Sequence, residues 1–149
     1  MEGVLDGRLT IGSSGDIIIT DHLRYLGSDT VTGRPAPGSG SVLGLIAEKN
    51  VEVRQVQNVF TRSKGIVINA SIIAMDKSFY VKNPYHQSQN NRNKTHGVMR
   101  LWGNIVQAER GVVGSYRIRD NLTRGFIKNW NYDSRLPHLD IPYYPPLRS

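Results

Sequence analysis

The sequence predicts an all-β protein of a single domain, built as a β-solenoid similar to a right-handed β-helix. Three observations favour this fold. Segments with the same order of apolar and polar residues recur along the chain, glycine is abundant at 15 of 149 residues, and no sustained 3.6-residue periodicity indicates a long helix. A chain of this length is sized for one domain, which would span residues 1–149.

The repeat is clearest in three segments: "LIAEKNVEV" (45–53), "IIAMDKSFYV" (72–81) and "IVQAERGVV" (105–113). Each has two apolar residues, then a polar corner that carries acid and base, then an apolar strand. A fainter copy, "TIGSSGDIII", lies at 10–19. The stretch 71–81 is therefore predicted as strand, corner and strand, and not as one amphipathic helix.

Each repeat also has a Gly or Asn just before its second apolar pair, where a strand can bend between two flat faces. Each copy would then be about three short strands, which make one coil of a solenoid. In this arrangement Ile46, Ile73 and Val106 stack in a shared interior column. Loops of variable length between coils explain the uneven spacing of the copies. The alternative is an antiparallel β-sandwich, which also has short strands and frequent turns.

Three segments cannot form the sheet. Residues 27–41 are rich in Gly, Pro, Ser and Thr and are predicted as a loop, and the polar tract 84–97 is predicted as a second loop. The C-terminal segment 133–149 holds four of the seven prolines, so we expect it to be extended. A solenoid needs its end coils covered, and the tail and the first loop are the predicted caps.

The charge of the chain is unevenly distributed. The net charge is +7; residues 1–75 hold seven basic and seven acidic side chains, whereas residues 76–149 hold twelve and five. The basic residues are scattered singly, which is typical of a solvated face. No window of about 18 apolar residues predicts a membrane span. The start "MEGVLDGRLT" lacks the pattern of a signal peptide, which fits a cytosolic product or a fragment of an exported protein.

The residue pattern predicts no catalytic residue, no cofactor and no metal site. Cysteine is absent, which excludes thiol catalysis and Cys-ligated metals. The nucleophile motif Gly-x-Ser-x-Gly, the calcium loop of EF-hands and paired zinc-binding histidines are all missing. We therefore predict that the protein is not an enzyme.

Aromatic and basic residues alternate between 116 and 135. Six of them are predicted to contact a ligand or partner: Arg117, Arg119, Arg124, Lys128, Trp130 and Tyr132. Aromatic rings beside cations hold sugars and single-stranded nucleic acids. The alternative is that the rings pack under the last coil while the basic groups face water.

Several segments resemble a bacterial domain of unknown function, numbered forty-nine hundred. They are "LTIGSSGDIIITDHLRY", "SVLGLIAEKNVEVR", "INASIIAMDKSFYV", "LWGNIVQAERGVVG" and "GFIKNWNYDSRLPHLDIPYYPP". The most specific parts are 131–136 and the proline-rich 141–146, where Ile141 departs from the family pattern. The resemblance implies a cell-surface or pilus-assembly protein, in which such a domain follows a prepilin-like hydrophobic helix. It implies no catalytic residues.

Repeat pattern and resemblance together predict a non-enzymatic structural or adhesive module of a bacterial surface or pilus-like assembly. The chain would be extracellular, bind protein partners of that assembly, and form a homo-oligomer by end-to-end stacking. One alternative is a carbohydrate-active or carbohydrate-binding β-helix with a polysaccharide ligand. A second is nucleic-acid binding through residues 116–135, which the scattered bases favour least.

Overall fold

The computed structural model describes residues 1–54, 65–82, 97–117 and 122–145, and of 116, 117 and 122–124 the backbone alone. These parts are mostly strand, so the predicted all-β class is confirmed. Their one helical element is a 3-10 turn at Leu136–His138. In these parts of the chain there is no helix with the length and apolarity to span a membrane.

The described segments contain twelve strands: β1 (Gly3–Leu5), β2 (Arg8–Ser13), β3 (Ile17–Ile19), β4 (Leu23–Tyr25), β5 (Val42–Ala47), β6 (Val51–Arg54), β7 (Ile66–Ala74), β8 (Phe79–Lys82), β9 (Val98–Gln107), β10 (Gly114–Arg117), β11 (Leu122–Gly125) and β12 (Ile127–Tyr132). Most are short, as the frequent corner residues predict.

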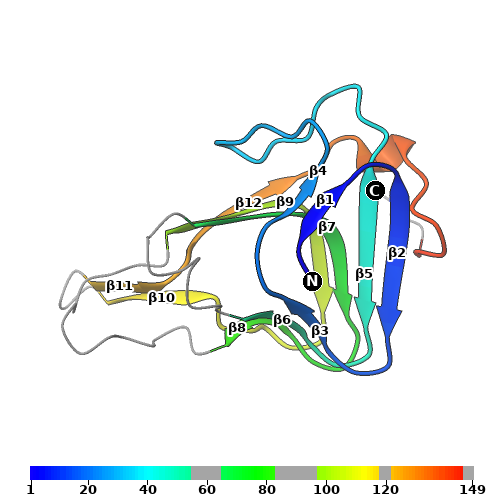
Figure 1. Cartoon of the computed structure of the whole chain (residues 1–149). Helices are drawn as coiled ribbons and strands as arrows, with labels where there is room; N and C mark the ends of the chain where they lie inside the picture. The colour runs from blue at the N-terminus through cyan, green and yellow to red at the C-terminus, as the bar shows by residue number, and fades with distance from the viewer. Residues whose placement is uncertain (55–64, 83–96, 118–121, 146–149) are drawn as a thin grey trace.

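Two of the sheets are parallel and connect segments far apart in the sequence (Figure 1). The larger has the order β1-β4-β7-β5-β2, with β9 beside β7 and β12 beside β9. The smaller has the order β3-β6-β8, and β10 and β11 form an antiparallel pair apart from both. The long strand β7 pairs with β4 at Ile68, opposite Leu23, and with β5 from Ser71 to Ala74, while β9 follows its whole length.

The predicted strand, corner and strand at 71–81 is confirmed. Strand β7 ends at Ala74, the chain bends, and β8 begins at Phe79. Corners of successive copies bond to each other: Asp16 Oδ1 accepts from the Asn50 N–H at 2.9 Å, and Asn50 Oδ1 accepts from the Ser78 N–H at 3.3 Å. These short polar side chains satisfy backbone donors that a tight bend leaves unpaired.

The predicted column is correct in register and wrong in its direction. Ile46 pairs with Ile73, and Ile73 pairs with Val106. These three side chains point outward, however, and Val106 is 54% exposed. The interior column lies one residue earlier: Leu45 and Ile72 are fully buried in the main core, against which Ile105 packs. Successive strand residues face opposite sides, so a shift of one residue reverses the face.

The C-terminal tail covers the outward face of β5 and β7. Leu136, Ile141 and Tyr144 are buried against Val42. Gly44 leaves room for them, because a Cβ at this position would lie 2.6 Å from the Tyr144 side chain and 2.9 Å from that of Ile141. The described part of the predicted extended cap thus contains one 3-10 turn and lies along the side of the sheet.

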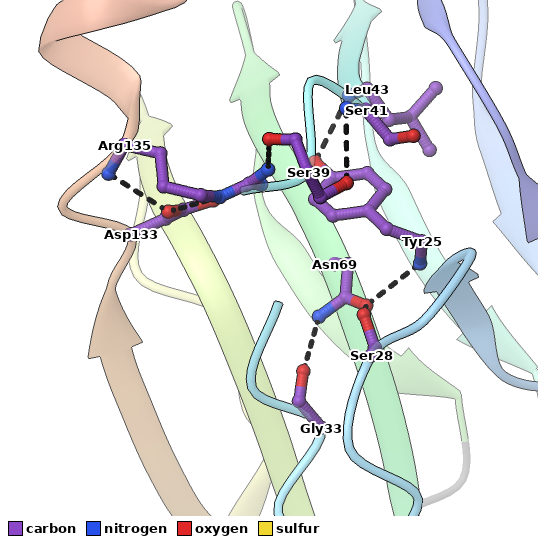
Figure 2. Close-up of polar contacts among 9 residues, drawn as sticks. All are labelled: Tyr25, Ser28, Gly33, Ser39, Ser41, Leu43, Asn69, Asp133 and Arg135. Atoms are coloured by element: carbon purple, nitrogen blue, oxygen red, sulfur yellow. Dashed lines mark hydrogen bonds and ion pairs between the residues drawn. The ribbon is translucent and has the colours of Figure 1, made fainter. Parts of the chain in front are cut away.

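The loop predicted at 27–41 is fastened to the same face by Asn69 of β7, which is fully buried (Figure 2). Its Oδ1 accepts from the Tyr25 N–H at 2.9 Å and from the Ser28 hydroxyl at 3.0 Å, and its Nδ2 donates to the Gly33 carbonyl at 2.9 Å. The buried Asn69 amide thus uses both acceptor positions of its oxygen and one of its two amide protons. The second predicted loop, 84–97, lies almost wholly outside the described residues.

Candidate functional site

The six predicted contact residues divide into two groups. Arg119 lies outside the described residues, and for Arg117 and Arg124 only the backbone of β10 and β11 is described, with Arg117 opposite Leu122. The other three, Lys128, Trp130 and Tyr132, alternate along β12.

The side chains of β12 continue the columns of the core. Lys128 pairs in register with Met99, Trp130 with Leu101, and Tyr132 with Gly103. Met99 and Leu101 are buried and point inward, so the three β12 side chains share the inward side of the last strand in the sheet. They nevertheless reach solvent, because Trp130 is 41% and Tyr132 57% exposed. We call Lys128, Trp130 and Tyr132 the terminal row.

Trp130 both packs on the core and lies at the surface. Its ring meets the buried Phe79 ring edge to face, with centroids 6.4 Å apart and planes at 77°. The Lys128 Nζ lies 4.8 Å from the centroid of the same indole ring, over its face. The two interpretations of the sequence, ring packing under the last coil and an exposed contact, therefore both describe Trp130.

The terminal row carries positive charge without a carboxylate partner among the described side chains. Burial, and secondarily the nearby Arg110, lower the pKa of Lys128. The acid next to Arg110 in sequence, Glu109, lies instead near Lys77 at 3.9 Å. Two neighbouring cations without a counter-ion among the described side chains favour the approach of an anionic group.

The backbone of the terminal row is also available. The Ile127 N–H donates to the Gly97 carbonyl on the β9 side at 2.9 Å. Backbone groups of alternate residues point to opposite edges of a strand, so those of Lys128, Trp130 and Tyr132 point away from β9. Within the described segments no strand pairs with this outer edge of β12. The same three residues thus present inward side chains, and backbone donors and acceptors to which no described strand is paired.

A second polar cluster lies on the smaller sheet. The Tyr80 hydroxyl donates to Glu52 Oε2 at 2.6 Å, and Arg54 Nε donates to Glu52 Oε1 at 2.8 Å. Burial raises the pKa of Glu52, but the bonds from Tyr80 and Arg54 outweigh it and the net pKa is lowered. Burial and the same carboxylate raise the pKa of Tyr80 to about 12. Both groups are thereby held in one protonation state at neutral pH, which suits a structural pair better than an acid and base.

The described segments contain no candidate metal site. In them, no three His, Cys, Asp or Glu side chains gather as a metal site would require. His22 is occupied in the fold, since its Nδ1 accepts from the Val67 N–H at 2.9 Å. A cavity of about 230 Å³ lies within the tail, lined among others by Leu139, Asp140 and Tyr144. It holds a single charged group and no cluster of polar side chains.

Comparison of the chain with known protein families, with curated proteins and with solved structures found no match. The fold and the terminal row therefore carry the functional argument. Sequence reasoning found Lys128, Trp130 and Tyr132 but not Phe79 or Arg110. Phe79 and Arg110 lie in other repeat copies than β12. They come near β12 only because of how the strands align in the sheets.

Proposed function

We propose that this chain is a right-handed β-solenoid that acts as a non-enzymatic structural or adhesive module of a bacterial surface or pilus-like assembly. The observation that supports this most is the parallel ladder β2-β5-β7-β9. Equivalent positions of the three clear repeat copies are register partners in it, and the fainter copy joins through β2 with Ile11 opposite Leu45. Backbone hydrogen bonds that run along such a stack make it rigid, which suits a passive scaffold.

The strand pairing favours a solenoid over a sandwich. Sandwich sheets are antiparallel, whereas every pairing in the two larger sheets of this chain is parallel. The successive copies also place their strands in the same two sheets: β2 and β3, then β5 and β6, then β7 and β8. A chain that winds in repeated coils produces this order.

The surface location is tested on intact cells that carry the gene. Gold-labelled antibody against the purified chain should bind the outside of unpermeabilised cells, and deletion of the gene should remove the label. Label that appears only after permeabilisation would contradict the proposal. The same cells without antibody, and a strain with an antibody against a known cytosolic protein, control for leakage.

Carbohydrate binding is the second candidate, and the terminal row favours it. Tyr132 is 57% exposed, and Trp130 presents part of its ring beside the Lys128 cation. Acidic polysaccharides could stack on the rings and pair with the ammonium. Titration calorimetry with neutral and acidic polysaccharides tests this, with Tyr132→Ala expected to weaken any binding and Tyr143→Ala, which removes an exposed ring from the tail, as control.

Nucleic-acid binding through 116–135 is the third candidate and depends on arginine side chains outside the described part of the structure. Such binding should weaken steeply as salt rises. A fluorescence titration with a labelled single strand at two salt concentrations measures this slope.

A further inference from the structure

We propose that the outer edge of β12 binds strand β1 of a second copy, so that copies of the chain stack head to tail. This inference rests on the proposed solenoid and names its partner at the terminal row. Within the described segments, β12 is the edge strand on one side of the larger sheet. On the other side β1, which pairs with β4, is an edge strand.

One register column runs between these two strands. Gly3 pairs with Leu23, Leu23 with Ile68, Ile68 with Leu101, and Leu101 with Trp130. Continued into a second copy, the column places Gly3 of that copy against Trp130. Gly3 has no side chain, and no heavy atom lies within 4 Å of the place where a Cβ would be. The glycine therefore leaves space for the indole ring at the junction.

The backbone groups of the two edges match in this register. The Gly3 N–H donates to the His22 carbonyl and the Leu5 carbonyl accepts from the Leu26 N–H, both at 2.9 Å. The backbone groups of Val4 and its alternate neighbours therefore point away from β4. With Gly3 opposite Trp130, the Trp130 N–H faces the carbonyl of residue 2 and its carbonyl faces the Val4 N–H, as parallel pairing requires.

A second pair of strands would meet in the same stack. β12 covers β9 only as far as Gly103, so residues 104–107 lack a described strand on that side. Their column partners at the opposite end are residues 10–13 of β2, through β5 and β7. Stacking would cover Ile105 with Ile11, both only partly buried against the core.

The charges of the two ends are complementary. Residues 1–25 contain four acidic and two basic side chains, a net charge of −2, whereas the described side chains of residues 98–115 and 125–132 include three basic and one acidic, a net charge of +2. Opposite charges favour contact between unlike ends and oppose contact between like ends. Such a contact between two different surfaces does not close on itself and extends into a filament.

The charge of Lys128 determines whether the outer edge of β12 pairs with another strand or is kept from pairing. A lysine on the inward side of an edge strand blocks pairing when its charge is left without a partner. In the stack, Lys128 continues the column of Ile66 and Met99 and would come near Met1 and Glu2, which precede β1 of the second copy. The Glu2 side chain is exposed, and its carboxylate, which accepts from the Thr20 hydroxyl at 2.9 Å, keeps the negative charge that would neutralise the ammonium.

The test is sedimentation of the whole purified chain over a range of concentrations at low and high salt. The chain should associate as its concentration rises. Val4→Pro should weaken association roughly tenfold, the loss expected for one or two backbone hydrogen bonds. The Val4 side chain is 65% exposed and its N–H points away from β4, so this proline should leave the monomer folded. Val4→Thr, which keeps the N–H, is the matched control, and circular dichroism checks the fold of each variant.

A charge exchange provides the second arm. Lys128→Glu and Glu2→Lys should each weaken association, and the two substitutions together should restore it. A chain that stays monomeric at every concentration overturns the proposal and assigns Lys128 to protection of the edge. Association that is unchanged by Val4→Pro and by the charge exchange overturns the proposal as well, because the contact then lies elsewhere. Surface labelling of cells does not depend on stacking, so the two proposals can fail separately.

Discussion

Arg135 binds both carboxylate oxygens of Asp133, with its Nε at 3.0 Å and its Nη2 at 2.7 Å, and the two side chains are only 11% and 3% exposed (Figure 2). The same guanidinium donates from Nη1 to the Ser39 carbonyl at 2.6 Å and lies 5.1 Å from the centroid of the Tyr25 ring. One arginine thus joins the tail, the loop before β5 and the end of β4. A planar guanidinium suits this role because it donates in several directions at once.

Removal of the charge on Asp133 should destabilise the protein strongly. Asp133→Asn leaves Arg135 largely buried without a counter-ion, and loss of one partner of such a pair costs about 3 kcal/mol or more. Urea unfolding measures the free energy of unfolding. Asp140→Asn, at an exposed position in the same tail, is the control and should change it by less than about 0.5 kcal/mol. Equal effects of the two substitutions would contradict a special role for the Arg135–Asp133 pair.

Asn69 should hold the loop locally as well as stabilise the fold. Asn69→Ala removes the acceptor of the buried Tyr25 N–H and the donor to Gly33, and each unsatisfied buried group costs about 1–3 kcal/mol. Hydrogen exchange should show faster exchange of the Tyr25 amide in the variant. Asn129→Ala, at an exposed position of β12, should leave that amide as protected as before.

The tail should leave its place when Gly44 gains a side chain. The Cβ of Gly44→Ala would lie within 3 Å of both Tyr144 and Ile141, so we expect the tail to shift off the sheet. Trypsin should then cut after Arg135, which is nearly buried in the native chain, at a higher rate. Gly12→Ala adds the same methyl group to the exposed neighbouring strand, where nothing lies within 4 Å, and should leave the cleavage rate unchanged.

The hydroxyl of Tyr80 should titrate late. Burial and the hydrogen bond to Glu52 raise its pKa to about 12, above the value near 10 of an unfolded chain. A raised pKa stabilises the folded state below pH 10, and this contribution is lost as the pH rises through 12. Glu52→Gln removes the carboxylate and should shift the Tyr80 transition to lower pH in an absorbance titration of tyrosinate. Tyr80→Phe identifies the transition, and an unchanged curve in Glu52→Gln would contradict the assigned cause.

The candidate site was only partly readable from the sequence. Alternation of aromatic and basic residues identified Lys128, Trp130 and Tyr132, because alternate residues of any strand share a face. It could not show that this face is the inward one at the last strand of a sheet, with Phe79 against Trp130. Nor could it place Arg110 near Lys128, since that proximity depends on how the strands align.

The sequence by itself determined the strand, corner and strand of the repeat and the register of its three clear copies. Apolar pairs before a polar corner are local features, so Ile46, Ile73 and Val106 could be aligned without coordinates. Only the tertiary structure decided which side of each strand is the interior. Leu45 and Ile46 are both apolar, because the tail covers the outward face of β5 as the core covers the inward one. A strand covered on both faces has no polar side to mark its direction.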